Sequence, residues 1–153
     1  MKNIVLLLCL VLVSCSLPRV TLLDDPLTGQ EHLQLGAAYE EQGEFELALR
    51  EYKAAARSLP EGHLYGGNVL FQQGNLDAAV QAYSRAIRTM PEDPRPLNNL
   101  AWLYYTRGQN LDRALELATR AVELAPEGAK DPYLDTMEKI HLARQSQPES
   151  PRP

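Results

Sequence analysis

The chain has 153 residues, of which 44% are hydrophobic and 23% charged, so it is long enough for one domain and ordinary in composition for a soluble globular protein. It carries 15 Lys and Arg residues against 20 Asp and Glu residues, a formal net charge of -5. This acidic balance disfavours nucleic acid as a partner, since phosphate binding relies on clustered basic side chains.

The N-terminus has the pattern of a secretory signal. Lys2 precedes an uncharged apolar run, Ile4 to Val13, which is too short to span a bilayer because a spanning helix needs about 20 residues. Residues 12–15, Leu-Val-Ser-Cys, resemble the bacterial lipobox, in which the cysteine is diacylated on its thiol and the chain is cut just before it. The resemblance implies a lipoprotein signal peptide at 1–14, cleavage after Ser14 and lipidation of Cys15. The alternatives are a secreted protein with a chance cysteine and a short buried N-terminal helix.

Lipidation of Cys15 has three further consequences. Cys9 would leave with the signal peptide, so no disulfide is expected. The two or three acyl chains implied would anchor the protein firmly, whereas one chain binds only reversibly. Ser16 stands where an aspartate would signal inner-membrane retention in enteric lipoproteins, so we expect the periplasmic side of the outer membrane if the source has two membranes.

Residues 15–27 are interpreted as the lipidated N-terminus and a tether, because 16–27 hold two prolines and no helical or strand periodicity. The folded part is expected at 28–145 and begins with a capping box, Thr28 to Glu31. A first helix should run to about Gln42, and Gly43 should stop it. The next helix should start near Phe45 and end before Pro60.

The same kinds of residue then recur in the same order, three times in all. The first set is Gly36, Gly43, Ala48, Tyr52, Ala55 and Pro60. The second is Gly67, Gly74, Ala79, Tyr83, Ala86 and Pro91. The third is Ala101, Gly108, Ala114, Ala118, Ala121 and Pro126. Each position of the second set lies 31 residues after its counterpart, and the third set follows 34 or 35 residues later, a period typical of stacked helix pairs.

These positions resemble the tetratricopeptide repeat, over residues 29 to 126. The resemblance implies an all-α, right-handed α-solenoid of three helix pairs, with repeats at about 29–60, 61–91 and 94–126. Small residues let the two helices of a pair approach closely, and the aromatic residues fill the space beside them. One pair cannot bury its apolar face alone, so adjacent pairs must stack.

Several details of the pattern give local expectations. Asn75 and Asn110 are expected N-caps, and Asp93 followed by Pro94 has the form of a cap before an N-terminal proline. An extra residue after Gly108 should lengthen only the turn.

The second repeat departs most from the pattern. Only Glu61 to Gly66 separate Pro60 from Gly67, so we expect the first helix of repeat two to start late and to lack most of a turn. The adjacent glycines at 66 and 67 cost roughly 1 kcal/mol each relative to alanine, so this helix should also be the weakest.

After Pro126 the sequence predicts one more amphipathic helix, at 132–144, which carries Tyr133, Leu134, Met137, Ile140 and His141 at helical spacing. No second helix follows it, so it should cap the last pair. Residues 146–153 form a tail with three prolines, which we expect to be disordered.

In the family that the chain resembles, the first helix of each repeat lines a concave groove. Counted onto repeat one, the groove positions are Leu33, Gln34, Ala37, Glu40 and Glu41. Those of repeats two and three are richer in aromatic and amide residues, which suit an extended peptide. The candidate binding residues are Tyr65, Asn68, Phe71, Gln72, Asn98, Asn99, Trp102 and Tyr105, with Leu64 and Thr106 at the other two positions.

Two observations bear on the interpretation of these residues as a binding groove. Trp102 and its aromatic neighbours could instead pack against adjacent helices or the capping helix. The resemblance does not extend to the basic clamp that some members use for a C-terminal carboxylate. Leu33, Ala37 and Tyr65 stand where that clamp has a lysine and two asparagines.

The sequence shows no nucleophile, metal or phosphate constellation: His32, His63 and His141 lie in different expected helices, and the glycine-rich stretch 62–67 lacks the lysine of a phosphate loop. We therefore expect no catalytic residue, no metal, no cofactor and no small-molecule substrate. The expected function is a membrane-anchored, non-catalytic adaptor that binds an envelope protein or peptide, in assembly, in pilus or secretion systems, or in docking of cell-wall enzymes. The alternatives are an accessory subunit of a separate envelope peptidase, a self-associating structural protein, and an enzyme.

Overall fold

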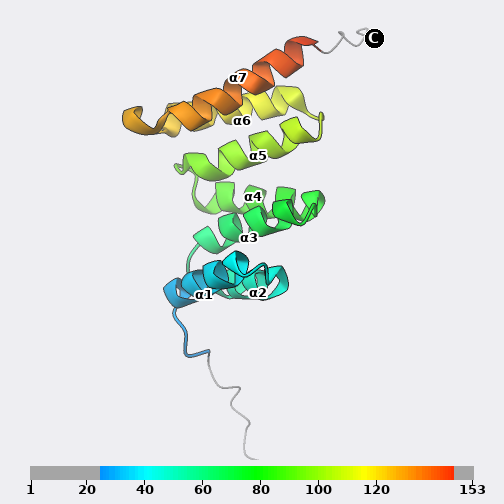
Figure 1. The fold of residues 1–153 in the computed structure, drawn as a ribbon. Helices are drawn as coiled ribbons and strands as arrows, with labels where there is room; N and C mark the ends of the chain where they lie inside the picture. The colour runs from blue at the N-terminus through cyan, green and yellow to red at the C-terminus, as the bar shows by residue number, and fades with distance from the viewer. Residues whose placement is uncertain (1–24, 147–153) are drawn as a thin grey trace, which may run out of the picture.

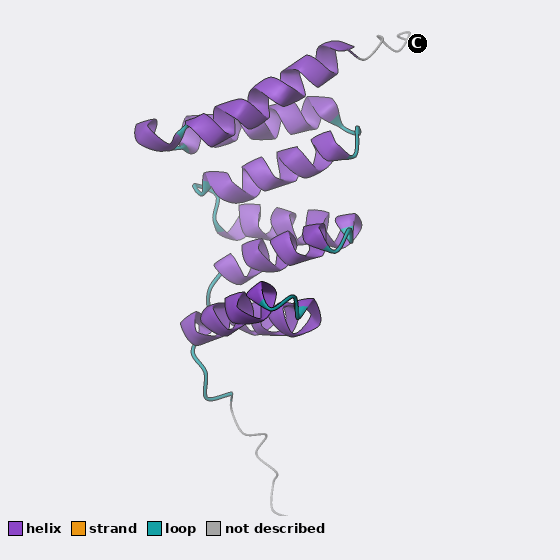
Figure 2. Cartoon of the chain, viewed as in Figure 1, coloured by secondary structure: helices purple, strands orange, loops and turns teal. Residues whose placement is uncertain are grey.

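The computed structural model describes residues 25–146. The expected signal peptide, Cys15, most of the tether and residues 147–153 lie outside this range. Within it the chain forms seven α-helices, one short 3-10 helix and no β-strand (Figure 2). The helices are α1 (Gly29–Glu41), α2 (Phe45–Ala55), α3 (Glu61–Gln72), α4 (Leu76–Thr89), α5 (Pro94–Thr106), α6 (Leu111–Leu124) and α7 (Asp131–Ser146), with the 3-10 helix at Glu127–Ala129.

The helices form three pairs that stack along one direction, with α7 lying on the last pair (Figure 1). The pairs are α1 with α2, α3 with α4, and α5 with α6, and α7 packs on α6 and α5. Each pair turns at a glycine with positive φ, namely Gly43 at 76°, Gly74 at 74° and Gly108 at 62°. The expected arrangement of three helix pairs and a capping helix is therefore confirmed.

Close packing within the first two pairs depends on glycine. A Cβ atom at Gly36 would lie 2.7 Å from the ring of Tyr52, and one at Gly67 would lie 2.6 Å from the ring of Tyr83. Both tyrosines are buried at 2% exposure. The predicted role of the small residues, which is to let the paired helices approach, is confirmed for these two pairs.

The buried apolar residues fall into two clusters. The larger spans the second and third pairs and α7, from Leu64 and Tyr83 to Leu117 and Ile140. The smaller consists of Ala48, Tyr52 and Val69 and joins the first pair to α3. The first pair thus has a core that is partly its own.

The expected helix caps are confirmed at two positions. Thr28 Oγ1 accepts from the backbone N–H of Glu31 at 3.2 Å, and the Glu31 carboxylate accepts from the backbone N–H of Thr28 at 2.7 Å. Asp93 accepts from the backbone N–H of Arg95 at 2.9 Å, with Pro94 as the first residue of α5. At both helix starts the N-cap side chain therefore satisfies one of the free backbone N–H groups, as the sequence predicts.

The other two caps are correct in position only. Asn75 and Asn110 stand at the N-cap positions of α4 and α6, but their side chains make no capping hydrogen bond. Asn110 has φ 52°, which takes up the extra residue of the third turn. The predicted lengthening of that turn alone is confirmed.

The expectation that the first helix of repeat two starts late is wrong. Helix α3 begins at Glu61, directly after Pro60, and has 12 residues against 13 in α1 and in α5. The missing residues come from α2, which has 11 residues while α4 and α6 have 14 each. A Cβ atom at Gly62 would lie 2.4 Å from the carbonyl oxygen of Tyr52, so only a glycine lets α3 begin against the end of α2. The greater weakness of α3 stays a prediction.

Helix α7 packs on the last pair through a face different in part from the expected one. Thr136 and Ile140 are buried, and Tyr133 and Met137 pack against the larger cluster. Leu134 and His141 are exposed, so their expected inward position is wrong. Each follows a residue of the packed face by one position, which turns its side chain about 100° away from that face.

Candidate functional site: the concave groove

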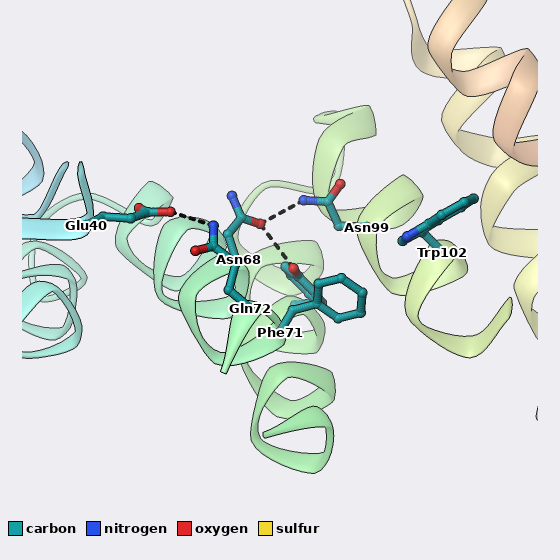
Figure 3. Close-up of a pocket in the computed structure, with 7 residues that line it drawn as sticks. Glu40, Asn68, Phe71, Gln72, Asn99 and Trp102 are labelled. Atoms are coloured by element: carbon teal, nitrogen blue, oxygen red, sulfur yellow. Dashed lines mark hydrogen bonds between the residues drawn. The ribbon is translucent and has the colours of Figure 1, made fainter. Parts of the chain in front are cut away.

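A pocket of about 290 Å³ lies where the first helices of the three pairs meet (Figure 3). Five of the eight candidate binding residues line it: Asn68, Phe71 and Gln72 from α3, and Asn99 and Trp102 from α5. Glu40 from α1 and Tyr83 from α4 complete its lining. We call these seven residues the concave groove.

Hydrogen bonds between side chains link the three pairs across this groove. Glu40 Oε1 accepts from Gln72 Nε2 at 2.9 Å, which joins α1 to α3. Asn68 Oδ1 accepts from Asn99 Nδ2 at 2.9 Å, which joins α3 to α5. Side-chain hydrogen bonds therefore connect each helix pair to the next across the groove.

Two buried tyrosines of the second helices donate hydrogen bonds to polar side chains of the groove. The Tyr52 hydroxyl donates to Glu40 Oε2 at 2.8 Å, and the Tyr83 hydroxyl donates to Asn68 Oδ1 at 3.0 Å. Burial raises the pKa of both phenols well above the usual range, and for Tyr52 the bond to Glu40 adds to the effect. Both hydroxyls therefore stay protonated and act as fixed donors that orient the groove side chains.

The asparagine pair leaves one donor and one acceptor free. Within the described part of the chain, neither Asn68 Nδ2 nor Asn99 Oδ1 makes a hydrogen bond, and both side chains are partly exposed. The Asn68 Nδ2 donor and the Asn99 Oδ1 acceptor are complementary to the C=O and N–H groups of a peptide backbone.

Trp102 both packs against neighbouring side chains and lines the groove, so the packing predicted as an alternative is present, and ligand contact stays a prediction. Its ring lies 5.1 Å from that of Tyr105 between centroids, and Lys139 Nζ of α7 lies 5.6 Å from its ring centroid. It remains half-buried and faces the pocket beside Phe71. The packing fixes the ring in place while part of its surface stays open.

The other three candidates lie outside this pocket. Tyr65 lines a separate pocket of about 280 Å³ with Gln30, Leu33, Gln34, Ala37 and Tyr52. The Asn98 side chain has a buried Oδ1 atom without a hydrogen-bond partner in the described residues. Tyr105 contacts Trp102 but does not line the pocket.

Sequence reasoning missed one member of the groove. Tyr83 was assigned to packing alone, since its spacing marks it as the aromatic residue of the second helix. The available signal was its hydroxyl, because a buried tyrosine usually needs a hydrogen-bond partner and Asn68 lies on the facing helix.

The sequence pattern also gave no role to His32. Its side chain is buried, and its Nδ1 lies 2.8 Å from Glu51 Oε2 while its Nε2 lies 3.2 Å from Asp25 Oδ2. Arg50 Nε also pairs with Glu51, at 3.0 Å. These contacts tie the start of α1 to α2, away from the groove.

Two further findings concern metal and membrane. Among residues 25–146, no group of three or more His, Cys, Asp or Glu side chains could hold a metal ion. In the same range, no helix has the length and apolar character needed to cross a bilayer.

Comparisons with known proteins agree with the repeat pattern. The "TPR repeat" family model matches residues 67–108. No curated protein matches the chain in sequence.

Among solved structures, PcrH from Pseudomonas aeruginosa is 20% identical, with a TM-score of 0.67 over 74% of this chain and 91% of that one. The type III secretion chaperone SycD of Yersinia enterocolitica, in complex with a YopD peptide, is 20% identical with a TM-score of 0.67 over 75% and 93%. The first TPR of Spaghetti (RPAP3), bound to an HSP90 peptide, is 18% identical with a TM-score of 0.69 over 80% and 97%. At these identities the likeness concerns the fold. The chain contains a tetratricopeptide repeat, and its fold is a right-handed α-solenoid of three such helix pairs with a C-terminal capping helix.

Proposed function

We propose that this protein is a non-catalytic adaptor that binds an extended segment of a partner protein in the concave groove. The observation that carries the proposal is the Asn68–Asn99 pair, which bridges two repeats and leaves Asn68 Nδ2 and Asn99 Oδ1 free. One residue of an extended chain can accept from the first through its C=O and donate to the second through its N–H, because these two groups of the same residue point to the same side. Binding through backbone atoms would hold the segment and leave sequence preference to its side chains.

The aromatic residues beside the asparagine pair supply the apolar part of the site. Phe71 and Trp102 line the same pocket, and Trp102 is held by Tyr105 and Lys139. A tryptophan fixed before binding loses little side-chain entropy on contact, which is the property of interface hot spots. An aliphatic or aromatic side chain of the bound segment would lie against these rings.

The structural neighbours support binding of this kind. PcrH is known in complex with the chaperone binding region of PopD, and SycD in complex with a peptide of YopD. The RPAP3 domain is bound to the HSP90 peptide SRMEEVD. This chain has Leu33, Ala37 and Tyr65 at the positions of the basic clamp, so we expect an internal segment of the partner and not its C-terminal carboxylate.

We further propose that Cys15 is lipidated and holds the domain to a membrane outside the cytoplasm, most simply the outer membrane on its periplasmic side. The support is the lipobox-like sequence before Cys15 and the serine after it. A tether of a dozen residues reaches on the order of 40 Å when extended, enough to place the groove clear of the lipid headgroups. The partner would then be a protein of the cell envelope that is brought to, or kept at, the membrane.

In-cell crosslinking with mass spectrometry tests the groove. We expect the crosslinked partner found with the wild type to disappear with Trp102→Ala and with Asn99→Ala. Asn75→Ala is the matched control, because Asn75 is an exposed turn residue without a side-chain capping bond. The same partner crosslinked equally to the wild type and to folded Trp102→Ala and Asn99→Ala would overturn the groove.

The anchor has its own test. Cys15→Ser should abolish uptake of labelled palmitate and release the protein from the membrane fraction. A Cys15→Ser variant that keeps both would refute lipidation and leave the groove proposal untouched.

A further inference from the structure

A second pocket, of about 430 Å³, lies on the opposite face of α3, between α2 and α4. We call it the convex pocket and define it by its lining: Leu49, Lys53, Ala56, Arg57, Gly62, His63, Gly66, Leu70, Ala82 and Arg85. Its volume lies within the range of about 300 to 1,000 Å³ typical of small-molecule sites. It shares no residue with the concave groove.

The convex pocket lies over Gly66, which has no side chain at a position where the other two repeats have a leucine. The counterparts of Gly66 in the other two repeats are Leu35 and Leu100, and Leu100 is buried at 5% exposure. A Cβ atom at Gly66 would contact only Tyr52 Cβ, at an ordinary 3.8 Å, whereas one at Gly62 or Gly67 would collide. Packing therefore does not require a glycine at position 66, although glycine weakens a helix. Its effect is to keep the pocket open.

The charged residues around this space are all basic. Lys53, Arg57 and Arg85 line the pocket, and none of its lining residues is acidic. Within residues 25–146 none of these three forms an ion pair, in a chain where acids outnumber bases. Three unpaired cations beside Leu49, Leu70 and two alanines create a site with an apolar lining and a positive rim.

We propose that the convex pocket binds a small amphipathic anion, an aliphatic chain that ends in a carboxylate or a phosphate. The chain would occupy the space over Gly66 that a leucine fills in the other repeats. Lys53, Arg57 and Arg85 would bind the head group, since guanidinium groups pair with carboxylate and phosphate oxygens through two N–H donors. This inference does not rest on the proposed peptide groove.

His63 provides a reporter inside the pocket. Burial lowers the pKa of His63, and the positive charges of Arg85 and Arg88 lower it further. Lys53 and Arg57 are the other charged residues of the lining. A bound anion would offset these charges, so it should raise the pKa of His63, which NMR titration measures directly.

Isothermal titration calorimetry on the full chain tests the binding, with decyl phosphate and decanoate as probes below their micellar concentrations. We expect one saturable site per chain. Gly66→Leu should weaken binding by about a hundredfold or more, because about four buried methylene contacts are lost to the new side chain. Gly66→Ala should have a smaller effect, and both variants should melt no lower than the wild type.

Charge variants and matched probes separate a specific site from general adhesion. The triple variant Lys53→Gln, Arg57→Gln, Arg85→Gln should lose binding, while Arg120→Gln should keep it, since Arg120 is the counterpart of Arg85 one repeat further on. Decylammonium and decyl maltoside should not bind, and inorganic phosphate should bind more weakly than decyl phosphate.

Vesicles identify the source of the anion. Binding to phosphatidylglycerol vesicles that is lost in Gly66→Leu supports a lipid as the ligand, and binding to the free amphiphiles alone supports a soluble one. Absence of saturable binding of either amphiphile to the wild type would overturn the proposal. Equal binding to folded Gly66→Leu would also overturn it.

Discussion

The two joints between the helix pairs are built in different ways. At the joint between the second and third pairs, buried apolar side chains such as Leu64, Leu97 and Leu100 form one continuous core. At the joint between the first and second pairs, Gly62 brings the backbone of α3 onto the end of α2, and the shared core is small. The repeat pattern thus permits either side-chain packing or backbone contact, and the second solution leaves the convex pocket open.

We expect the largest effect from a substitution that disrupts the backbone contact of Gly62 with the end of α2. Gly62→Ala would place a Cβ atom 2.4 Å from the Tyr52 carbonyl oxygen and 2.5 Å from the Ala56 nitrogen. Backbone atoms cannot move aside as a side chain can, so we expect a loss on the order of 3 kcal/mol in the free energy of unfolding, measured by urea denaturation.

Hydrogen exchange would locate this damage. In Gly62→Ala we expect faster exchange in α1 and α2 and little change in α5 and α6. Gly128→Ala is the control, because a Cβ atom there meets nothing within 4 Å. A Gly62→Ala protein as stable as the wild type would show that the joint does not depend on backbone contact.

We expect smaller losses of stability from substitutions of Tyr52 and Tyr83, the two tyrosines that hydrogen-bond to groove residues. Tyr52→Phe removes one of the two side-chain donors to Glu40 in the described residues and leaves Gln72, and after Tyr83→Phe the Asn68 oxygen still accepts from Asn99. We expect each substitution to cost about 1 kcal/mol, since a net protein hydrogen bond contributes about that much.

Thermal unfolding of the two phenylalanine variants, each alone and combined with Gln72→Ala, measures the difference. Coupling with Gln72→Ala is expected for Tyr52→Phe, because Glu40 accepts from both residues, and not for Tyr83→Phe. Equal coupling in both double variants would mean that Glu40 does not link the first pair to α3.

Most of the fold follows from local patterns in the sequence. The turn glycines, the capping box at Thr28 and the Asp93–Pro94 start of α5 depend on residues close together in the chain, and the structure agrees at each. The recurrence of small residues also indicates which helices approach closely. At Gly36 and Gly67 the tyrosine ring of the paired helix occupies the space that a Cβ atom would need.

The errors arise where two distant elements share a constraint. The short spacing before Gly67 gives the number of missing residues, but only the contact of Gly62 with α2 shows that α2 loses them. The bond between Asn68 and Asn99 likewise depends on the register between α3 and α5, which no local pattern specifies. For the same reason the groove could be outlined from spacing, while its donor and acceptor could not.

Gly66→Ala should make the first joint more like the second. The added Cβ atom has room, and alanine favours the helix over glycine by about 0.5 to 1 kcal/mol. We therefore expect a gain of that size in the free energy of unfolding. Gly67→Ala is the adjacent control and should lose stability, because its Cβ atom would meet the Tyr83 ring at 2.6 Å. A loss in both variants would mean that position 66 needs its glycine for packing.

The smallest expected effect is a pH dependence of stability that arises from His63, at the joint between the first and second pairs. Burial, with Arg85 and Arg88, lowers the pKa of His63 in the folded protein below its ordinary value of 6.5. The unfolded chain then binds more protons than the folded one below that pH, so stability is full above about pH 6.5 and falls as the pH drops. We expect His63→Gln to flatten the decrease in Tm between pH 7 and 5, and His141→Gln, which changes an exposed residue of α7, to leave it unchanged. The same slope in the wild type and in His63→Gln would show that protonation of His63 does not oppose the charges around the convex pocket.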